Sequence, residues 1–184
     1  FTKQEKPLIA QIWGLVPDDF AFATREIVEK GFDGVDINMG CPAKKVVKRG
    51  ACSGLIKNPT LAAEIIAAVK ENAGELPVSV KTRMGFGEIV TEEWTQFLLE
   101  QDIAALTMHG RLASEMSLKP ANWDEIKKAV DIRNSMGIDT VMVGNGDIKS
   151  LAEGTILADK SGVDGIMIGR GIFKDPWIFN HPAP

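Results

Sequence analysis

The chain has 184 residues, of which 45% are hydrophobic and 25% are charged, and its formal net charge is -4. This composition is typical of a soluble globular protein with one sizeable core. The acidic balance argues against a protein that coats nucleic acid with its whole surface, but it leaves a local basic site open. Because no apolar run could form a transmembrane helix and no signal peptide is visible, we expect a cytoplasmic protein without membrane contact.

Two cysteines, Cys41 and Cys52, are too few for a disulfide scaffold. Only two histidines, His109 and His181, could assist them, and the four residues follow no metal-site pattern. We therefore expect a reducing compartment and no metal site.

The chain begins with a short apolar run, Leu8 to Ile12, which predicts a buried strand with Gln11 near its end. A glutamine there could face a ligand or satisfy loop backbone, and both interpretations stay open. Asp18 is expected to cap the next helix, which ends at Gly31.

The second strand is expected over residues 34–38, and the loop after it presents Cys41, held in place by Pro42. A thiol at the carboxyl end of a strand lies where α/β enzymes carry reactive groups, although a lone cysteine more often closes a turn. Cys52 lies among small residues without an activating partner, so we interpret it as a packing residue.

Four cations follow the cysteine within six residues: Lys44, Lys45, Lys48 and Arg49. Such a run is usually a solvated surface. Its position directly after Cys41 also favours a polyanionic substrate.

The rest of the chain alternates helices and strands. Asn58 and Pro59 begin a helix that ends at Gly74, and Ser150 with Glu153 predicts a capping box at a later one. The other expected elements are a strand over 77–81, a helix capped by Thr91, a strand over 104–108, a helix over 123–136, strands over 140–143 and 163–168, and a last helix from Pro176 to Phe179.

Every predicted strand delivers polar or glycine-rich groups at its carboxyl end. These groups are Gln11, Cys41, Lys81, His109, Asn145, Gly146, Asp147, Gly169 and Arg170. A (β/α)8 barrel carries its active site in this way, whereas an open doubly wound sheet concentrates ligand groups at a switch point. We therefore predict an α/β fold of the TIM-barrel type.

The predicted barrel is incomplete, because a complete one typically needs more than roughly 200 residues. The last two strand ends have the glycine-rich, phosphate-binding character of barrel strands 7 and 8. We therefore assign the six strands as numbers 3 to 8 and expect the N-terminal units to be missing, in keeping with a chain that opens at Phe1 and not at a methionine. Residues 1–180 are expected to form this domain.

The strand ends indicate the chemistry of a site. Lys81 closes an apolar strand, where an unpaired ammonium is costly, so it should meet an anion, a polarisable ligand or a carboxylate. The glycines at 144–147 and 169–171 allow backbone N–H groups to approach a phosphate, and Arg170 adds a forked charge. No carboxylate pair supports glycoside hydrolysis, whereas a lysine and a histidine opposite a thiol suit a flavin.

Five segments together resemble the tRNA-dihydrouridine synthase family. They are residues 36–43 (DINMGCPA), 80–85 (VKTRMG), 109–111 (HGR), 144–148 (GNGDI) and 165–171 (GIMIGRG). The first segment is the specific one, since the others occur in looser form among flavin barrels. Their order and spacing match from Gln11 to Phe179.

The resemblance implies an enzyme with tightly bound FMN that reduces selected uridines in tRNA, with NADPH as reductant. Cys41 would then be the general acid that protonates C5 of the uracil, in keeping with an ordinary thiol, which is mostly protonated at neutral pH. Asn38 would contact the target base. Gln11, Lys81 and His109 would contact the flavin ring or ribityl chain, and Asn145, Gly146, Asp147, Gly169 and Arg170 would hold the ribityl chain and phosphate. Arg111 and the cations Lys44, Lys45, Lys48 and Arg49 would contact the tRNA backbone.

The chain departs from the family pattern in two large features. The first barrel strand of the family and its C-terminal helical domain have no match, so residues 181–184 would begin the linker to that domain. The resemblance also implies a monomer. The alternatives are an FMN barrel that reduces a free small molecule, such as a dihydroorotate- or enoate-type oxidoreductase, and a tRNA- or phosphate-binding fragment that does not catalyse.

Overall fold

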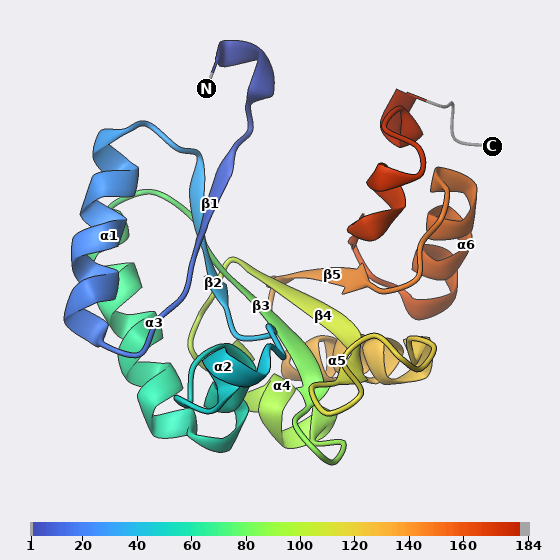
Figure 1. The fold of residues 1–184 in the computed structure, drawn as a ribbon, viewed down its shortest axis with the longest axis horizontal. Coiled ribbons are helices and arrows are strands. Elements are labelled where there is room, and N and C mark those ends of the chain that lie inside the picture. Colours follow the sequence, from blue (N-terminus) through green and yellow to red (C-terminus); the bar gives the residue numbers. More distant parts are fainter. Residues whose placement is uncertain (1, 181–184) are drawn as a thin grey trace.

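The computed structural model describes residues 2–180 and contains a six-stranded, all-parallel sheet in the order β1-β2-β3-β4-β5-β6 (Figure 1). The strands are β1 (Ile9–Ile12), β2 (Gly34–Asn38), β3 (Val78–Gly85), β4 (Ala105–Leu112), β5 (Val141–Asn145) and β6 (Gly165–Met167). The α-helices are α1 (Pro17–Glu29), α2 (Lys44–Val47), α3 (Pro59–Ala73), α4 (Thr91–Leu99), α5 (Trp123–Met136) and α6 (Leu151–Ser161). Short 3-10 turns occupy Lys3–Glu5, Cys52–Lys57, Arg170–Phe173 and Ile178–Asn180.

The core lies between the sheet and the helices on its outer face. Val35 and Ile37 of β2 and Val80 of β3 are fully buried, and Ile65 of α3 and Leu98 of α4 pack in the same cluster. Parallel strands covered by helices read as continuous apolar runs, which explains why β2 and β3 were recognisable in the sequence. Burial of this face therefore holds the carboxyl ends of the strands in register.

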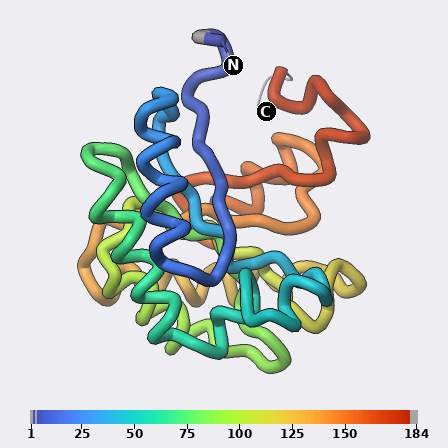
Figure 2. Tube along the Cα trace, turned by 60° about the vertical axis from the view of Figure 1, so that its left-hand side comes forward, coloured from blue at the N-terminus to red at the C-terminus, as the bar shows by residue number. Residues whose placement is uncertain are grey.

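The sheet does not close. In the described part of the chain, β1 pairs only with β2 and β6 pairs only with β5. Trp13 after β1 and Trp177 after β6 are more than half exposed. Figures 1 and 2 both show the first residues and the segment after β6 at the same end of the molecule. The predicted incomplete (β/α)8 barrel is confirmed, and the numbering of its strands as 3 to 8 stays a prediction.

Several helix ends follow the sequence signals. The Asn58 side chain accepts a hydrogen bond from the Leu61 amide, and Gly137 ends α5 in the left-handed conformation. Ser150 Oγ accepts from the Glu153 amide at 3.1 Å, but the Glu153 carboxylate accepts from the Lys149 amide and not from Ser150. The predicted capping box is therefore only half formed.

Two predicted caps are wrong. Helix α1 begins at Pro17 and α4 at Thr91, so the N-caps are Val16 and Val90. Asp18 lies in the first turn of α1, where a carboxylate interacts favourably with the helix dipole. The hydrophobic cap residues left no signal in the sequence.

The strands also differ in length from the prediction. β3 and β4 each continue to eight residues, which places Arg83 and Arg111 on strands rather than in loops. β6 has three residues, and the last helix expected from Pro176 is a 3-10 turn over Ile178–Asn180. The linker expected over residues 181–184 lies outside the described residues. None of the described helices is both long and apolar enough to cross a membrane.

Candidate functional site

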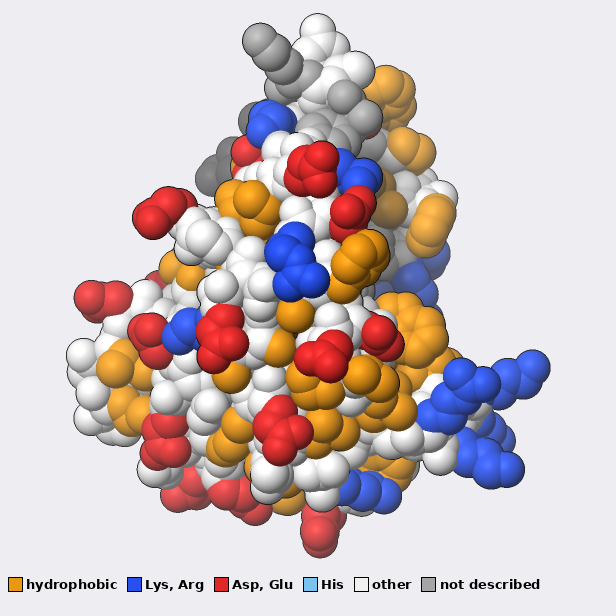
Figure 3. All heavy atoms as spheres, turned by 90° about the vertical axis from the view of Figure 1, so that its left-hand side faces the viewer, with side chains coloured by type: hydrophobic (Ala, Val, Ile, Leu, Met, Phe, Trp, Pro, Cys, Tyr) orange, Lys and Arg blue, Asp and Glu red, His pale blue; other side chains and the backbone are white. Residues whose placement is uncertain are grey.

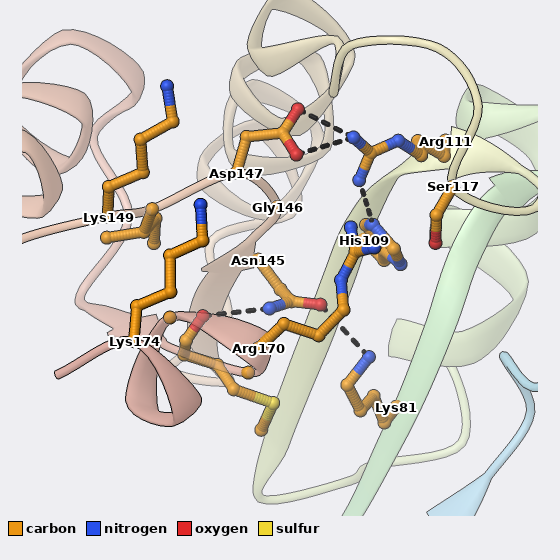
Figure 4. Close-up of a pocket in the computed structure, with 14 residues that line it drawn as sticks. Lys81, His109, Arg111, Ser117, Asn145, Gly146, Asp147, Lys149, Arg170 and Lys174 are labelled. Atoms are coloured by element: carbon orange, nitrogen blue, oxygen red, sulfur yellow. Dashed lines mark hydrogen bonds and ion pairs between the residues drawn. The ribbon is translucent and has the colours of Figure 1, made fainter. Parts of the chain in front are cut away.

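The carboxyl ends of β3 to β6 surround a pocket of about 530 Å³ (Figure 4). Eight of the predicted site residues line it: Lys81, His109, Arg111, Asn145, Gly146, Asp147, Gly169 and Arg170. The register explains this convergence, since His109 of β4 lies opposite Asn145 of β5, which lies opposite Met167 of β6. The polar groups predicted at the ends of β3 to β6 therefore share one site, whereas Gln11 and Cys41 are not among the residues that line it.

Lys81 is the half-buried cation of the pocket. Its ammonium donates to Asn145 Oδ1 at 3.2 Å, and the Asn145 amide in turn donates to the Met167 carbonyl at 2.8 Å. Burial and the nearby charge of Arg83 lower the pKa of Lys81 to about 8, although Asp36 acts in the opposite direction. In the described residues Lys81 makes no ion pair, so the pocket presents a cation without a protein counter-ion.

His109 is neutral and holds one defined tautomer. The Arg111 guanidinium lies 2.9 Å from His109 Nε2, and because Arg111 can only donate, Nε2 accepts and the ring proton sits on Nδ1. Burial and the charges of Arg83, Lys81 and Arg111 lower the pKa of His109 to about 3. His109 can therefore donate a hydrogen bond from Nδ1 but carries no positive charge at neutral pH.

Arg111 is part of the pocket wall. Its side chain is only 3% exposed, and it donates to both carboxylate oxygens of Asp147 and to the Lys119 carbonyl. Asp147 also accepts from the Ala121 amide at 2.8 Å. Burial raises the pKa of Asp147, but these hydrogen bonds and the charge of Arg111 lower it overall. Asp147 was expected to contact the phosphate and Arg111 the tRNA, but in the structure their side chains are hydrogen-bonded to each other.

Glycines bring the backbone close to the pocket. Gly146 has a φ of 136°, and a Cβ there would lie 2.5 Å from the Ala121 side chain. A Cβ on Gly171 would lie 2.8 Å from the Ile148 carbonyl. A side chain at either position would clash with its neighbours or strain the backbone. The glycines therefore leave the backbone of the loops after β5 and β6 accessible from the pocket.

Two cations of the pocket were not singled out in the sequence. Lys149 follows β5 and Lys174 follows the turn after β6, and with Arg170 they add three positive charges to the lining (Figure 4). The available signal was their position directly after the glycine-rich segments. Together they make the pocket suited to a phosphorylated or otherwise anionic ligand.

The residues around Cys41 form a separate hydrogen-bonded group. Asn38 Oδ1 accepts from the amides of Gly40 and Cys41, both at 3.0 Å, and Asn38 Nδ2 donates to Gln11 Oε1 at 2.9 Å. Gln11 Nε2 donates to the buried Asp36 at 2.7 Å. Gln11 and Asn38 therefore do not line the pocket with Lys81 but support the cysteine loop (residues 39–43).

Arg83 joins the cysteine loop to the loop after β4. Its buried guanidinium donates to the carbonyls of Gly40 at 2.7 Å, Leu112 at 3.0 Å and Met116 at 2.8 Å. Burial and the charge of Arg111 lower the pKa of Arg83 to about 10. The sequence interpretation assigned it no role, because β3 was expected to end before it.

The two cysteines differ in exposure. Cys41 is half-buried, whereas Cys52 is 1% exposed, and burial raises its pKa to about 12. Ser53 Oγ donates to the Cys41 carbonyl at 2.9 Å, which ties the segment of Cys52 to the cysteine loop. This geometry agrees with a packing role for Cys52.

The four cations after Cys41 lie on the surface, in α2 and the turn that follows it. Lys44, Lys45, Lys48 and Arg49 are all exposed. Figure 3 shows Lys and Arg side chains gathered at one edge of the face that carries α1 and α3, while acidic side chains are spread over the rest. Among residues 2–180, no group of histidine, cysteine and carboxylate side chains could hold a metal ion.

The fold and the pocket define a barrel protein whose functional groups gather at the carboxyl ends of parallel strands. The sequence narrows this class, because residues 1–183 match the family described as dihydrouridine synthase (Dus). The chain belongs to the dihydrouridine synthase family, as the sequence segments had indicated.

Curated relatives agree with this family. The chain is 46% identical over 180 residues to a "Probable tRNA-dihydrouridine synthase" of Staphylococcus aureus (strain COL), covering 97% of this chain and 54% of that protein. It is 47% identical to "Probable tRNA-dihydrouridine synthase 2" of Bacillus subtilis (strain 168), covering 97% and 55%. The chain thus spans about half the length of these relatives.

Solved structures share the fold. An Eimeria tenella DHODH in complex with ferulenol superposes with a TM-score of 0.66 at 12% identity, covering 90% of this chain and 52% of that one. Morphinone reductase in complex with tetrahydroNAD gives 0.60 at 16% identity, covering 89% and 47%. These identities are too low to indicate more than a shared barrel architecture.

Proposed function

We propose that this chain carries the catalytic barrel of an FMN-dependent tRNA-dihydrouridine synthase, which reduces the C5–C6 bond of specific uridines in tRNA with NADPH as reductant. The observation that carries the proposal is Lys81, a half-buried ammonium that faces a cation-lined pocket without an ion-pair partner in the described chain. Such a group calls for an anionic ligand. Family membership and the names of the relatives supply the substrate class.

The pocket residues fit FMN by their chemistry. The Lys81 ammonium would lie against the electron-rich edge of the ring, and the neutral His109 would donate from Nδ1. Lys149, Arg170 and Lys174 would neutralise the phosphate, with the backbone of Gly169 and Gly171 beside them. Asn145 and the Gly146 backbone would contact the ribityl chain. When bound, FMN would supply the hydride chemistry of the reduction.

Asp147 and Arg111 are assigned a supporting part in this proposal. Their mutual hydrogen bonds leave neither free for phosphate or tRNA, but they fix the His109 tautomer and the loop after β5. We therefore move Arg111 from the tRNA-contacting group to the group that positions His109.

Cys41 would act as the general acid that protonates C5 of the target uracil, its thiol becoming a thiolate. Cys41 lies half-buried in the loop after β2, beside the buried Cys52, and its amide is held by Asn38. Since Asn38 Oδ1 already accepts two backbone hydrogens, only its remaining Nδ2 hydrogen could reach the base. A contact with the uracil would then be to an acceptor such as a carbonyl oxygen.

tRNA would approach across the exposed cations Lys44, Lys45, Lys48 and Arg49, next to Cys41. The target uridine would have to leave its stack to reach the barrel mouth. Residues 1–180 would form this catalytic domain, which would act as a monomer in the cytoplasm. The part of the relatives that the chain does not span would supply further tRNA contacts.

The test is to purify the protein and measure flavin content and uridine reduction in unmodified tRNA with NADPH. We expect a yellow protein that releases FMN on denaturation. Cys41→Ala should retain FMN but lose at least about 100-fold in rate, in line with the contribution of a general acid. Cys52→Ala is the matched control and should stay within about threefold of the wild type if Cys52 is, as we propose, a packing residue. A colourless protein that cannot be reconstituted, or a larger loss in Cys52→Ala, would contradict the proposal.

A further inference from the structure

The buried carboxylate of Asp36 has no part in the pocket described above. It lies in the middle of β2 between Val35 and Ile37, which are fully buried, and its own exposure is 7%. The pKa of Asp36 is raised overall, because burial outweighs the hydrogen bonds from Ser79 and Gln11 and the charge of Lys81, which act in the opposite direction. A buried carboxyl group is costly unless it is hydrogen-bonded, and the structure gives Asp36 two side-chain donors.

The sheet register brings the partners of Asp36 into one row. Gln11 of β1 lies opposite Asp36 of β2, and Asp36 lies opposite Ser79 of β3. Ser79 Oγ donates to Asp36 Oδ1 at 2.6 Å, and Gln11 Nε2 donates to Asp36 Oδ2 at 2.7 Å. Asn38 projects from the same face of β2 two residues further on, because side chains alternate along a strand.

Each hydrogen bond in this group determines the direction of the next. An ionised carboxylate only accepts, so Gln11 must turn its NH₂ group toward Asp36 and its Oε1 toward Asn38. Asn38 must then present Nδ2 to Gln11 Oε1, at 2.9 Å. Its Oδ1 is left facing the amides of Gly40 and Cys41, which can only donate.

We propose that Asp36 is a positioning residue that fixes the backbone of Cys41 through the side-chain relay Asp36–Gln11–Asn38. Only the catalytic consequence of the relay rests on the proposed function: the relay would hold the proton donor Cys41 at one place in the barrel mouth. The relay itself is a property of the folded chain. Arg83 donates to the Gly40 carbonyl at 2.7 Å. The N–H and the carbonyl of Gly40 are therefore both hydrogen-bonded to side chains, those of Asn38 and Arg83.

The experiment measures hydrogen exchange of the Gly40 and Cys41 amides by NMR, without cofactor or substrate. Asp36→Leu removes the first acceptor, and Gln11→Met removes the link to Asn38. Each should lower the protection of these two amides by about tenfold, as expected for one weakened hydrogen bond. Gln11 is exposed, so its substitution tests the relay even if Asp36→Leu does not fold.

A swap of charge and amide tests the direction of the relay. In the double variant Asp36→Asn with Gln11→Glu, the amide at 36 donates to the carboxylate at 11, which can again accept from Asn38 Nδ2. Protection of both amides should return to within about threefold of the wild type. Ser79→Ala is the control, because it removes one donor to Asp36 but no link between Asp36 and Cys41.

The proposal is overturned if Gln11→Met leaves both amides as protected as in the wild type, or if the double variant is no better protected than Gln11→Met. A second measurement connects the relay to catalysis. Asp36→Leu and Gln11→Met should lower kcat for tRNA by about tenfold with KM nearly unchanged. If the wild type reduced no uridine, the proposed function would fail while the exchange data would still decide the relay.

Discussion

At the scale of single residues, the pocket depends on charges that the protein itself does not neutralise. Lys81 faces the pocket without an ion pair in the described chain, and the neighbouring His109 is kept neutral by burial and by the charges of Arg83, Lys81 and Arg111. A positively charged histidine would add to this repulsion. The neutral ring therefore allows several cations to share one small site.

This arrangement predicts a pH-dependent stability. The pKa of His109 is about 3 in the folded protein against an ordinary value of 6.5. Between these values the unfolded chain binds the extra proton, so the stability that His109 contributes is complete above pH 6.5 and is lost as the pH falls. Between pH 7 and pH 5 the free energy of unfolding should fall by about 2 kcal/mol more in the wild type than in His109→Gln. Urea unfolding at both pH values checks this, and equal losses would contradict it.

At the scale of secondary-structure elements, α2 and its following turn place four exposed cations next to the cysteine loop. None of the four lines the pocket around Lys81 and His109. The basic element and the pocket are therefore separate features on the same end of the sheet. Mutations of the four cations should therefore affect the binding of a polyanion without affecting the binding of a cofactor in the pocket.

We expect replacement of Lys44, Lys45, Lys48 and Arg49 by glutamine to weaken tRNA binding while flavin content stays unchanged. The slope of the logarithm of the binding constant against the logarithm of salt concentration should decrease by up to about 3, because fewer counterions are released. Binding titrations at several salt concentrations measure it. The control is glutamine at two exposed lysines of α5, Lys127 and Lys128, compared with the double replacement of Lys44 and Lys45. A similar slope change in the control would show that the effect is not local.

At the scale of the whole molecule, residues 2–180 form a six-stranded part of a barrel whose two sheet edges are unpaired and whose site pocket lies at the carboxyl ends of the strands. Binding energy from parts of the substrate remote from the target base can contribute to the rate. We therefore expect the protein to reduce uridine in tRNA at least about 100-fold faster than free uridine at equal concentration. Dihydrouridine formation on both substrates tests this, and equal rates would favour an oxidoreductase that acts on a free small molecule.

The sequence by itself determined the alternation of strands and helices, the incomplete barrel, and eight of the residues that line the pocket. Hydrophobic periodicity, helix-cap residues and glycines are signals that lie within short stretches of sequence. The carboxyl ends of parallel strands must in addition meet at one edge of the sheet. Lys81, His109, Asn145 and Arg170 were identified in this way.

Only the tertiary structure decided which polar side chains form hydrogen bonds with one another. Arg111 and Asp147 are separated by 36 positions, and Gln11 and Asp36 by 25, so no local pattern could pair them. The same holds for Lys149 and Lys174, which gather only when β5 and β6 lie side by side. Side-chain partners across strands depend on register, and register is set by packing of the whole sheet.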